Sequence, residues 1–571
     1  MLLTELANFL QQLESTSSRL AITQILSELF KKADADEIDK IVYLVLGSLA
    51  PQYEGLVFNL ADRLLIRAVS LAYQLSEEKT KAFYQRKGDL GTVVAELAKE
   101  KGESVTVSQV YQTLRQIAED EGENSQERKI NHFAKLLKEL DPLSAKYVIR
   151  IPLGKLRLGF SDKTVLDALS WLERGDKSAK ARLEKSYQVV PDVGLLAKRV
   201  KDLGIDKATK DIQPVVGVPV LPMLAQRLKS PKEMIEKMGK VFVEPKFDGL
   251  RVLIHFKRNQ PTNFIKAFTR NLNDVSNMFT ELTDIGNYIN ARQVILDTEA
   301  VGMDPEMVRL ADFQTTMRRR RKYQIDTKVK EIPLRFQVFD IITKDGKSYL
   351  DTPYHQRREI LKRAIKANQL LLVDEATVTD DPEVINQEYR DKIRQGLEGV
   401  IVKKYDTAYV PGRRGWRWVK MKEAELAVGK LADTVDCVVM GYYAGRGKRA
   451  SFGLGGFLVG VGDGDTFKSI TKIGTGLTDV QFRNMFQRLK KLGVKAKPKQ
   501  YSLVNKILIP DFWVTPSLIV EIAADEITKS PSHSAGFALR FPRLVRFRFD
   551  KSASQITTVA EIKKLYSLQR A

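Results

Sequence analysis

The residues with the clearest chemistry lie between positions 243 and 251, in the segment Val-Glu-Pro-Lys-Phe-Asp-Gly-Leu-Arg. An apolar strand leads up to Lys246, and Asp-Gly then turns the backbone before a second strand begins. A lysine held at a strand end can act as a nucleophile if its pKa falls from about 10.4 toward neutrality, and the positive charge of Arg251 favours the neutral amine. The same segment also fits an ordinary β-hairpin with a solvated Lys246.

Two glutamates further along the chain, Glu299 and Glu398, each lie at or beside the edge of a predicted strand. Carboxylates in such places can bind ribose hydroxyls or hold Mg²⁺ against phosphates. Taken alone, each also fits a surface glutamate. Phe339 lies in the apolar run 336–341, where its ring is suited either to core packing or to stacking.

Lys420 and Lys422 alternate with apolar residues in a predicted strand, so both ammonium groups face the same side. Two ammonium groups on one face are costly without an anion, and a phosphate would supply that anion. Arg414, six residues before Lys420, is placed to reach the same anion, whereas its neighbour Arg413 equally fits solvent exposure.

The overall charge points to a polyanionic partner. The chain has 571 residues, of which 93 are Lys or Arg and 71 are Asp or Glu, giving a formal net charge of +22. Nucleic acid and an anionic membrane surface both fit this excess. No stretch of about 18 apolar residues could span a bilayer, and Glu5 interrupts what would be the apolar part of a signal peptide. We therefore expect no membrane association and an intracellular protein, cytoplasmic and nucleoid-associated.

Cysteine and histidine are too sparse for most metal centres. The single Cys437 excludes a disulfide framework and a zinc site built from several thiolates. The four histidines are widely scattered, which disfavours a histidine-based centre. Any metal would therefore be a hard cation held by carboxylates and phosphates.

The chain changes character twice. Residues 1–212 are predicted to be mainly helical, since apolar residues recur at intervals of three and four in blocks such as 56–76, 107–119, 129–140 and 162–173. Their glycine- and lysine-containing loops at 87–91 and 154–159 suit either a phosphate backbone or ordinary helix capping.

The rest of the chain is richer in predicted strands. Residues 213–425 alternate short apolar strands with helical stretches such as 353–367, which indicates a mixed α/β domain. Residues 426–571 contain several short strands with glycine-rich connections, which favours a small β-barrel.

Six short elements resemble, in order, the motifs of the covalent nucleotidyltransferases, which comprise DNA ligases, RNA ligases and mRNA capping enzymes. The six matching segments are 246–251, 268–271, 295–300, 336–341, 398–403 and 418–422. The segments outside these six motifs distinguish between the three classes of enzyme. Residues 538–551 (Ala-Leu-Arg-Phe-Pro-Arg-Leu-Val-Arg-Phe-Arg-Phe-Asp-Lys), the sequence 222–225 (Pro-Met-Leu-Ala) and the helical N-terminal region closely resemble archaeal and eukaryotic-type ATP-dependent DNA ligases.

NAD-dependent DNA ligases fit less well because they carry a four-cysteine zinc element. This sequence departs mildly from the family pattern at Thr298, where relatives often have glycine, and at Asn271, where many also have glycine. Neither change removes a charged group that the chemistry needs.

The resemblance implies a multidomain α+β protein with a helical DNA-binding domain (1–212), a mixed α/β adenylation domain (213–425) and a C-terminal OB-fold β-barrel (426–571). It implies that Lys246 attacks the α-phosphate of ATP, that the adenylyl group passes to the 5′-phosphate of a nick, and that the 3′-hydroxyl then displaces AMP. The ATP-binding residues implied are Glu244, Arg251, Arg270, Glu299, Phe339, Arg414, Lys420 and Lys422. Glu299 and Glu398 would hold Mg²⁺. Arg548 and Lys551 would be brought over ATP by closure of the barrel domain.

The expected substrate is nicked double-stranded DNA, in replication, repair and recombination. The basic run 318–322 is a candidate phosphate-tracking patch, although a solvated helix face fits it as well. We expect a monomer, and a sliding clamp is a candidate partner. The alternatives are a capping enzyme or RNA ligase and a catalytically inactive DNA clamp. Labelling by GTP rather than ATP would reveal a capping enzyme, nicked duplex DNA or RNA would test the substrate, and the intact set of Lys246, Glu299, Glu398, Lys420 and Lys422 argues against the clamp.

Overall fold

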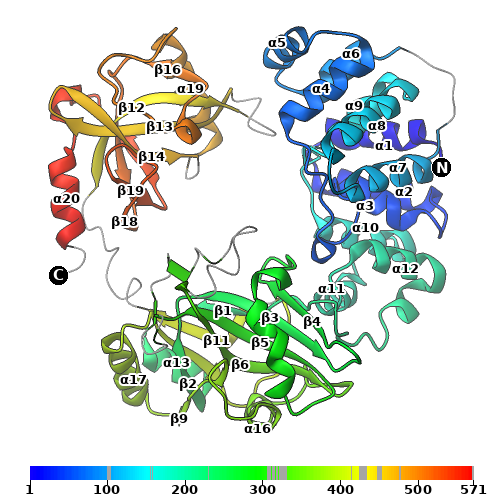
Figure 1. Cartoon of the computed structure of the whole chain (residues 1–571), viewed down its shortest axis with the longest axis vertical. Coiled ribbons are helices and arrows are strands. Elements are labelled where there is room, and N and C mark those ends of the chain that lie inside the picture. The colour runs from blue at the N-terminus through cyan, green and yellow to red at the C-terminus, as the bar shows by residue number, and fades with distance from the viewer. Residues whose placement is uncertain are drawn as a thin grey trace. The chain divides into compact units, whose positions relative to one another are not determined.

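The chain forms two compact units, Met1–Lys422 and Glu423–Ala571, in a computed structural model (Figure 1). The described residues are 1–99, 105–154, 156, 158–228, 230–304, 306, 310–311, 315–316, 319, 331–412, 414–422, 434–445, 453–474 and 477–568. Within them, no helix is both long and apolar enough to cross a membrane.

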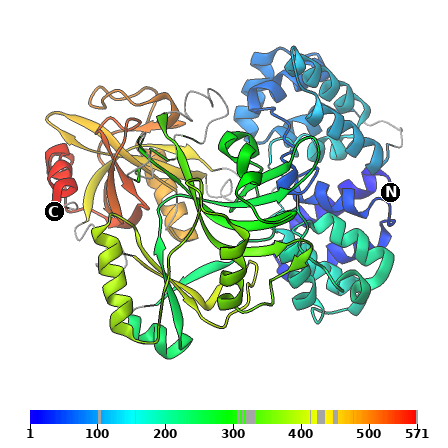
Figure 2. The ribbon, with the colours of Figure 1, turned by 60° about the horizontal axis from the view of Figure 1, so that its bottom comes forward.

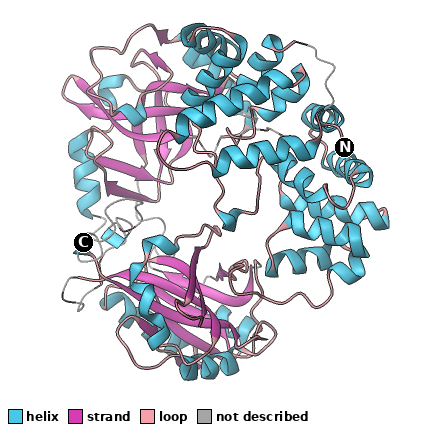
Figure 3. Ribbon diagram, turned by 45° about the vertical axis from the view of Figure 1, so that its right-hand side comes forward, coloured by secondary structure: helices cyan, strands magenta, loops and turns pink. Residues whose placement is uncertain are grey.

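The N-terminal part of the first unit is helical, as its 3.6-residue periodicity predicts (Figure 3). Its helices are α1 (Leu3–Ser15), α2 (Arg19–Lys32), α3 (Ile38–Leu46), α4 (Asp62–Tyr73), α5 (Glu77–Lys87), α6 (Leu90–Leu97), α7 (Val107–Glu119), α8 (Ser125–Glu139), α9 (Pro142–Val148), α10 (Asp162–Arg174), α11 (Lys180–Val189) and α12 (Val193–Ala208). The apolar faces of these helices share one buried core.

Polar residues begin several of these helices. The Gln109 N–H donates a hydrogen bond to the Thr106 hydroxyl, and the Thr106 N–H donates one to Gln109 Oε1, which forms a complete capping box before α7. Asp141 accepts from two backbone N–H groups at the start of α9, which has proline at its first position. Such caps satisfy backbone donors that a helix leaves unpaired.

The helical part continues into the sheets through a shared apolar cluster. Val189 at the end of α11 packs with Val220 and with Phe268 of strand β4 (Phe264–Thr269). The Leu221 N–H donates to the Gln188 carbonyl at 2.9 Å. These contacts fix the connection that precedes the first sheet.

Two sheets make up the rest of the first unit. The five-stranded sheet has the order β1-β11-β10-β2-β9, and the other has the order β4-β3-β5-β6-β7 with β8 also paired to β6. The strands are β1 (Leu224–Arg227), β2 (Val241–Lys246), β3 (Leu250–Lys257), β4 (Phe264–Thr269), β5 (Gln293–Gly302), β6 (Leu334–Lys344), β7 (Lys347–Ser348), β8 (Leu371–Val373), β9 (Thr377–Thr379), β10 (Gly399–Lys404) and β11 (Arg414–Lys422). The accompanying helices are α13 (Pro231–Met238), α16 (Tyr354–Ala364) and α17 (Pro382–Arg394).

Each sheet buries apolar side chains against its own helices. α13 and α17 pack against the five-stranded sheet, where Met234 and Ile385 join Val243 and Val402 in one cluster. α16 packs along β6 of the other sheet. β2 leads into β3 through the Asp248-Gly249 turn, so the chain passes from one sheet to the other immediately after Lys246.

The second unit is an antiparallel β domain (Figure 2, yellow to red). Its strands are β12 (Val435–Ala444), β13 (Leu454–Asp463), β14 (Thr466–Ile473), β15 (Gly493–Val494), β16 (Phe512–Val514), β17 (Ile519–Ala523), β18 (Glu526–Lys529), β19 (Phe537–Arg540) and β20 (Arg543–Phe547). Its helices are α19 (Asp479–Lys491) and α20 (Val559–Leu568), and both pack against β13.

Candidate active site

A cavity of about 1020 Å³ is lined by residues of both sheets in the first unit. The residues predicted from sequence that line it are Glu244, Lys246, Arg251, Arg270, Glu299, Phe339 and Lys420. Apart from Arg270, which directly follows β4, they lie in strands. Because they span 177 positions of the chain, they are brought together by the two sheets and not by a single segment.

Strand register explains why the lysines of different strands lie close to one another. β10 lies between β2 and β11, and both neighbours run antiparallel to it. Gly399 pairs with Lys246 on one side and with Lys422 on the other. Ile401, two residues on, pairs in the same way with Glu244 and Lys420. Since residues two apart share a face of a strand, the four charged residues belong to one face of the sheet.

Glu398 contacts two of these lysines at once. One carboxylate oxygen is ion-paired with Lys246 Nζ, and the other accepts a hydrogen bond from Lys422 Nζ at 2.9 Å. Burial alone would raise the pKa of Glu398, but the charges and hydrogen bonds of Lys246 and Lys422 outweigh burial and lower that pKa below its usual range. The carboxylate is therefore ionised at neutral pH and balances part of the positive charge.

Gly399 allows this arrangement because it has no side chain. Its φ is +142°, a conformation that L side chains rarely adopt, and a Cβ there would clash with the Met421 carbonyl oxygen. The close approach of β11 to β10 depends on this glycine.

Glu299 lies in the middle of β5, and not at a strand edge. It pairs in register with Arg251 of β3 and is half-buried in the cavity wall. Burial, opposed by the charges of Lys246 and Arg251, raises the pKa of Glu299 to about 7. A cation bound nearby would favour its ionised form.

Arg251 lines the cavity, but much of its guanidinium is used within the protein. Nε and Nη2 donate to the two oxygens of Asp297 at 3.0 and 2.6 Å, and Nη1 donates to the Met223 carbonyl at 2.7 Å. Asp297 is fully buried and also accepts from the Tyr409 hydroxyl at 2.8 Å. These bonds hold Arg251 against the aromatic ring of Phe339, 5.4 Å from its centroid.

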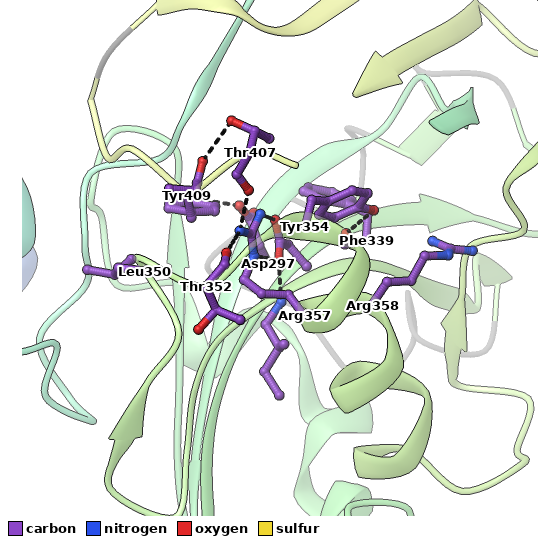
Figure 4. A network of polar contacts seen from close by, with 12 residues as sticks. Asp297, Phe339, Leu350, Thr352, Tyr354, Arg357, Arg358, Thr407 and Tyr409 are labelled. Carbon is purple, nitrogen blue, oxygen red and sulfur yellow. Dashed lines mark hydrogen bonds and ion pairs between the residues drawn. The ribbon is translucent and has the colours of Figure 1, made fainter. Parts of the chain in front are cut away.

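A buried polar network lies beneath Phe339, and Figure 4 shows Tyr354 beside this ring. Lys403 is 1% exposed; its Nζ donates to the Phe339 carbonyl and to the Tyr354 hydroxyl, each at 3.0 Å, and is ion-paired with Glu244 at 2.6 Å. Glu244 also accepts from the Tyr354 hydroxyl and from Arg358. A fully bonded network of this kind holds the strand carrying Phe339 in place.

Sequence reasoning did not single out Lys403, Tyr354, Arg358 or Asp297 as individual residues of the site. Lys403 and Asp297 lay inside recognised motif segments, so their position was a usable signal. Tyr354 and Arg358 come from α16, and only the packing of that helix on β6 brings them to the site.

Other predicted residues are less completely placed. Arg270 is exposed at the rim of the cavity, and Lys420 is half-buried in its wall. Arg414 begins β11, but its side chain lies outside what the structure describes, as does all of Arg413. In the basic run 318–322 only Arg319 is described; it is 5% exposed and ion-paired with Glu281 at 2.6 Å.

Arg548 and Lys551 lie in the second unit and share a carboxylate there. Arg548 Nη1 is 3.1 Å from both oxygens of Asp436, and Lys551 Nζ is 2.6 Å from one of them. Arg548 also pairs with Asp550 at 2.7 Å. The two cations thus converge on Asp436, which is 8% exposed.

Comparison with known proteins gives the same assignment over the whole length. Residues 2–170 match the family "DNA ligase N terminus", 222–422 match "ATP dependent DNA ligase domain", and 450–551 match "ATP dependent DNA ligase C terminal region". The chain is 39% identical to a probable DNA ligase of Dictyoglomus turgidum over 100% of this chain and 98% of that protein. It is 36% identical to a DNA ligase of Sulfurisphaera tokodaii over 99% of this chain and 97% of that protein.

A solved structure named "Pmar-Lig_Pre." is similar in fold, with a TM-score of 0.55 and 19% identity over 95% of this chain and 99% of that one. The predicted order of a helical region, an adenylation domain of mixed sheets and an antiparallel, OB-like β domain is confirmed. The chain therefore belongs to the ATP-dependent DNA ligases of the archaeal type, the enzymes that use ATP to seal nicks in DNA.

Proposed function

We propose that Lys246 is the nucleophile that carries the adenylyl group. The observation that carries this proposal is its position: a lysine at the end of β2, in the wall of the cavity, whose ammonium group is paired with a carboxylate that also pairs with Lys422. A lysine so held keeps its amine in a defined position at the cavity wall.

In the first step the neutral amine of Lys246 attacks the α-phosphorus of ATP. An N–P bond forms, the bond to the bridging oxygen breaks, pyrophosphate leaves and the amine loses a proton. Glu398, adjacent to Nζ, is the group placed to receive that proton. In the second step a 5′-phosphate oxygen of the nick attacks the same phosphorus and releases the lysine. In the third, the 3′-hydroxyl attacks the 5′-phosphate, forms the new phosphodiester bond and releases AMP.

The remaining cavity residues bind the nucleotide in this proposal. Phe339 and Glu244 form the side that receives adenine, while Arg251, Arg270 and Glu299 lie toward ribose and phosphates. Lys420, Lys422 and Arg414 neutralise phosphate charge as it develops. Arg548 and Lys551 act on the pyrophosphate portion of ATP.

Mg²⁺ is the metal that these residues suit. No cluster of three or more potential ligands is found in the described residues, and Mg²⁺ needs none, since it is commonly held by one or two carboxylates and substrate phosphates. Glu299 fits as a ligand because it is a half-buried carboxylate in the cavity wall. Glu398 would have to exchange a lysine for the metal. Bound Mg²⁺ supplies charge neutralisation at the phosphates.

Nicked double-stranded DNA is the proposed substrate, with residues 1–212 as the DNA-binding domain, 213–425 as the adenylation domain and 426–571 as the OB-fold domain. We further propose a monomeric enzyme, with a sliding clamp as a candidate partner.

The direct test is incubation with α-labelled ATP, GTP or NAD followed by a denaturing gel. Wild-type protein should retain label from ATP, and the variant Lys246→Ala should retain none. Lys257→Ala, which removes an exposed lysine at the end of β3, is the matched control and should label normally. Covalent label persisting in Lys246→Ala would overturn the assignment.

A further inference from the structure

The acidic residue on the adenine side of the cavity, Glu244, is already heavily engaged by protein donors. Its Oε1 accepts from the Tyr354 hydroxyl and from Arg358, and its Oε2 is 2.6 Å from Lys403 Nζ. Glu244 is only 1% exposed. Three of the roughly four acceptor positions of the carboxylate are therefore used by the protein, and its burial leaves a base donor almost no surface to reach. The amino group of adenine therefore needs another acceptor nearby.

Asp374 lies in the same cavity wall and has a carboxyl oxygen that can still accept a hydrogen bond. It is 5% exposed, lines the cavity together with Glu244 and Phe339, and its Oδ1 is a buried atom without a hydrogen-bond partner. Buried polar atoms are nearly always hydrogen-bonded, so an exception in a ligand cavity calls for a functional explanation.

The backbone of Asp374 is fixed next to Phe339. β8 runs parallel to β6, with Val373 paired to Val338, and the Asp374 N–H donates to the Val338 carbonyl at 3.1 Å. The Asp374 carbonyl accepts from Arg358, a residue of α16 seen in Figure 4. The carboxyl group is thus held beside the residue that precedes Phe339 in β6.

We propose that Asp374 accepts a hydrogen bond from the 6-amino group of adenine and thereby selects ATP over GTP. This proposal rests on the assignment of the cavity to ATP made above. Adenine presents an amino donor at position 6, whereas guanine presents a carbonyl acceptor there. With guanine bound, the buried oxygen of Asp374 would face another acceptor, and selection would come from that repulsion as well as from the favourable bond to adenine.

The charge state of Asp374 agrees with such a role. Burial, followed by the nearby charge of Glu244, raises the pKa of Asp374 well above its usual range, although Lys403 and Arg358 oppose the shift. A protonated carboxyl group keeps one oxygen as a neutral acceptor. The asparagine side chain has the same shape and the same carbonyl acceptor, so it should replace Asp374 in this function.

The test compares ATP with purine ribonucleoside triphosphate, which lacks the 6-amino group. The measured quantity is kcat/KM for formation of the covalent lysyl-nucleotide, expressed as the ratio between the two nucleotides. We expect wild-type protein to favour ATP and Asp374→Ala to lose about 10-fold of that preference. Asp374→Leu, which keeps the branching at Cγ but has no acceptor, should lose it as well, and both variants should gain labelling by GTP relative to ATP.

Two further variants test whether the loss of preference comes from the acceptor oxygen of Asp374. Asp374→Asn should keep the wild-type ratio within about 3-fold, because it retains the acceptor. Glu375→Gln removes the neighbouring exposed carboxylate and should leave the ratio unchanged. A general structural defect would reduce labelling by both nucleotides alike.

The proposal is overturned if Asp374→Ala and Asp374→Leu keep the wild-type ratio, or if Asp374→Asn loses it as fully as they do. Absence of covalent label in the wild-type protein with every nucleotide would instead contradict the assignment of Lys246, and this proposal would fail with it.

Discussion

Lys246 and Glu398 form an ion pair although they are 152 positions apart in the chain. The pair exists because β10 begins opposite the end of β2, where the Glu398 N–H donates to the Lys246 carbonyl at 3.0 Å. Lys422 reaches the same carboxylate from β11. One carboxylate therefore sets the positions of two ammonium groups on neighbouring strands.

Replacing this carboxylate should impair the first chemical step. In Glu398→Gln the two lysines lose their shared negative charge and a proton acceptor, and we expect lysyl-AMP formation to slow by about 10- to 100-fold, or about 1.4 to 2.7 kcal/mol in activation free energy. Labelling kinetics with α-labelled ATP measure this. Glu236→Gln, an exposed glutamate of α13, should label at the wild-type rate. An unchanged rate in Glu398→Gln would show that the ion pair does not contribute to the step.

Glu299 should make stability depend on pH in protein free of nucleotide and metal. The folded-state pKa of about 7 exceeds the usual 4.5, which means that folding favours the protonated carboxyl group. Its stabilising contribution to the free energy of unfolding is fully present below about pH 4.5 and is lost as the pH rises through about 7. Glu299→Gln stays neutral throughout. The melting temperature of this variant minus that of the wild type should therefore increase between pH 5 and pH 8. Glu383→Gln, which changes an exposed glutamate, is the control and should show no such trend. A pH-independent difference would contradict the shifted pKa.

Gly399→Ala should destabilise the adenylation domain. The added Cβ would clash with the Met421 carbonyl oxygen and would force alanine into a positive φ, a strain of about 1–3 kcal/mol before the clash is counted. Gly396→Ala imposes a positive φ of 81° but meets no atom within 4 Å, so it should cost less. Urea unfolding measures the loss in free energy of unfolding for each of the two variants. Equal losses would mean that the approach of β11 is not critical.

Asp436→Asn should slow only the reaction with ATP. Without the shared carboxylate, Arg548 and Lys551 are less well positioned, and we expect lysyl-AMP formation to fall by about 10-fold. Sealing of a nick that already carries AMP on its 5′-phosphate should stay at the wild-type rate, since no pyrophosphate is involved. Asp463→Asn, which removes the partner of Lys468 in the same unit, is the control. Equal slowing of both reactions would indicate a general folding defect.

DNA binding should weaken steeply with salt. A ligase must bind any sequence, so its contacts are mainly to phosphates, and each neutralised phosphate releases counterions. With about six or more contacts, the slope of log K against log salt should be about −5 or steeper. Fluorescence anisotropy of a labelled nicked duplex at fixed Mg²⁺ measures this slope. A nearly flat dependence would contradict backbone-dominated binding.

The sequence predicted those elements whose residue pattern carries the information. The repeat in 107–119 coincides with α7, and the apolar run from 334 corresponds to β6. α17 was not predicted, because its apolar stripe is narrow: Ile385, Tyr389 and Ile393 recur every four residues, and only Ile385 is fully buried. The strands β18 and β19, which pair with each other, have only four residues each and therefore carry too short an alternation to be detected from sequence.

The candidate site was predictable where ordered motifs identify it, as for Lys246, Glu299 and Lys420. Asp374 could not be found in that way, because its place in the cavity depends on the parallel pairing of β8 with β6. Asp436 likewise contacts residues 112 and 115 positions away. Spacing along a chain carries no signal for contacts that depend on how strands pair.

The carboxylate of Asp436 has a thermodynamic consequence for the proposed transfer of Arg548 and Lys551 to ATP. These two cations already have an anion, so reaching a triphosphate exchanges a carboxylate for phosphate oxygens. Such an exchange leaves neither cation uncompensated, but it deprives the Asp436 carboxylate of both partners, and that cost offsets part of the gain from the phosphate oxygens. The offset weakens the hold of the two cations on the nucleotide, which suits an enzyme that must release pyrophosphate before it engages a nick.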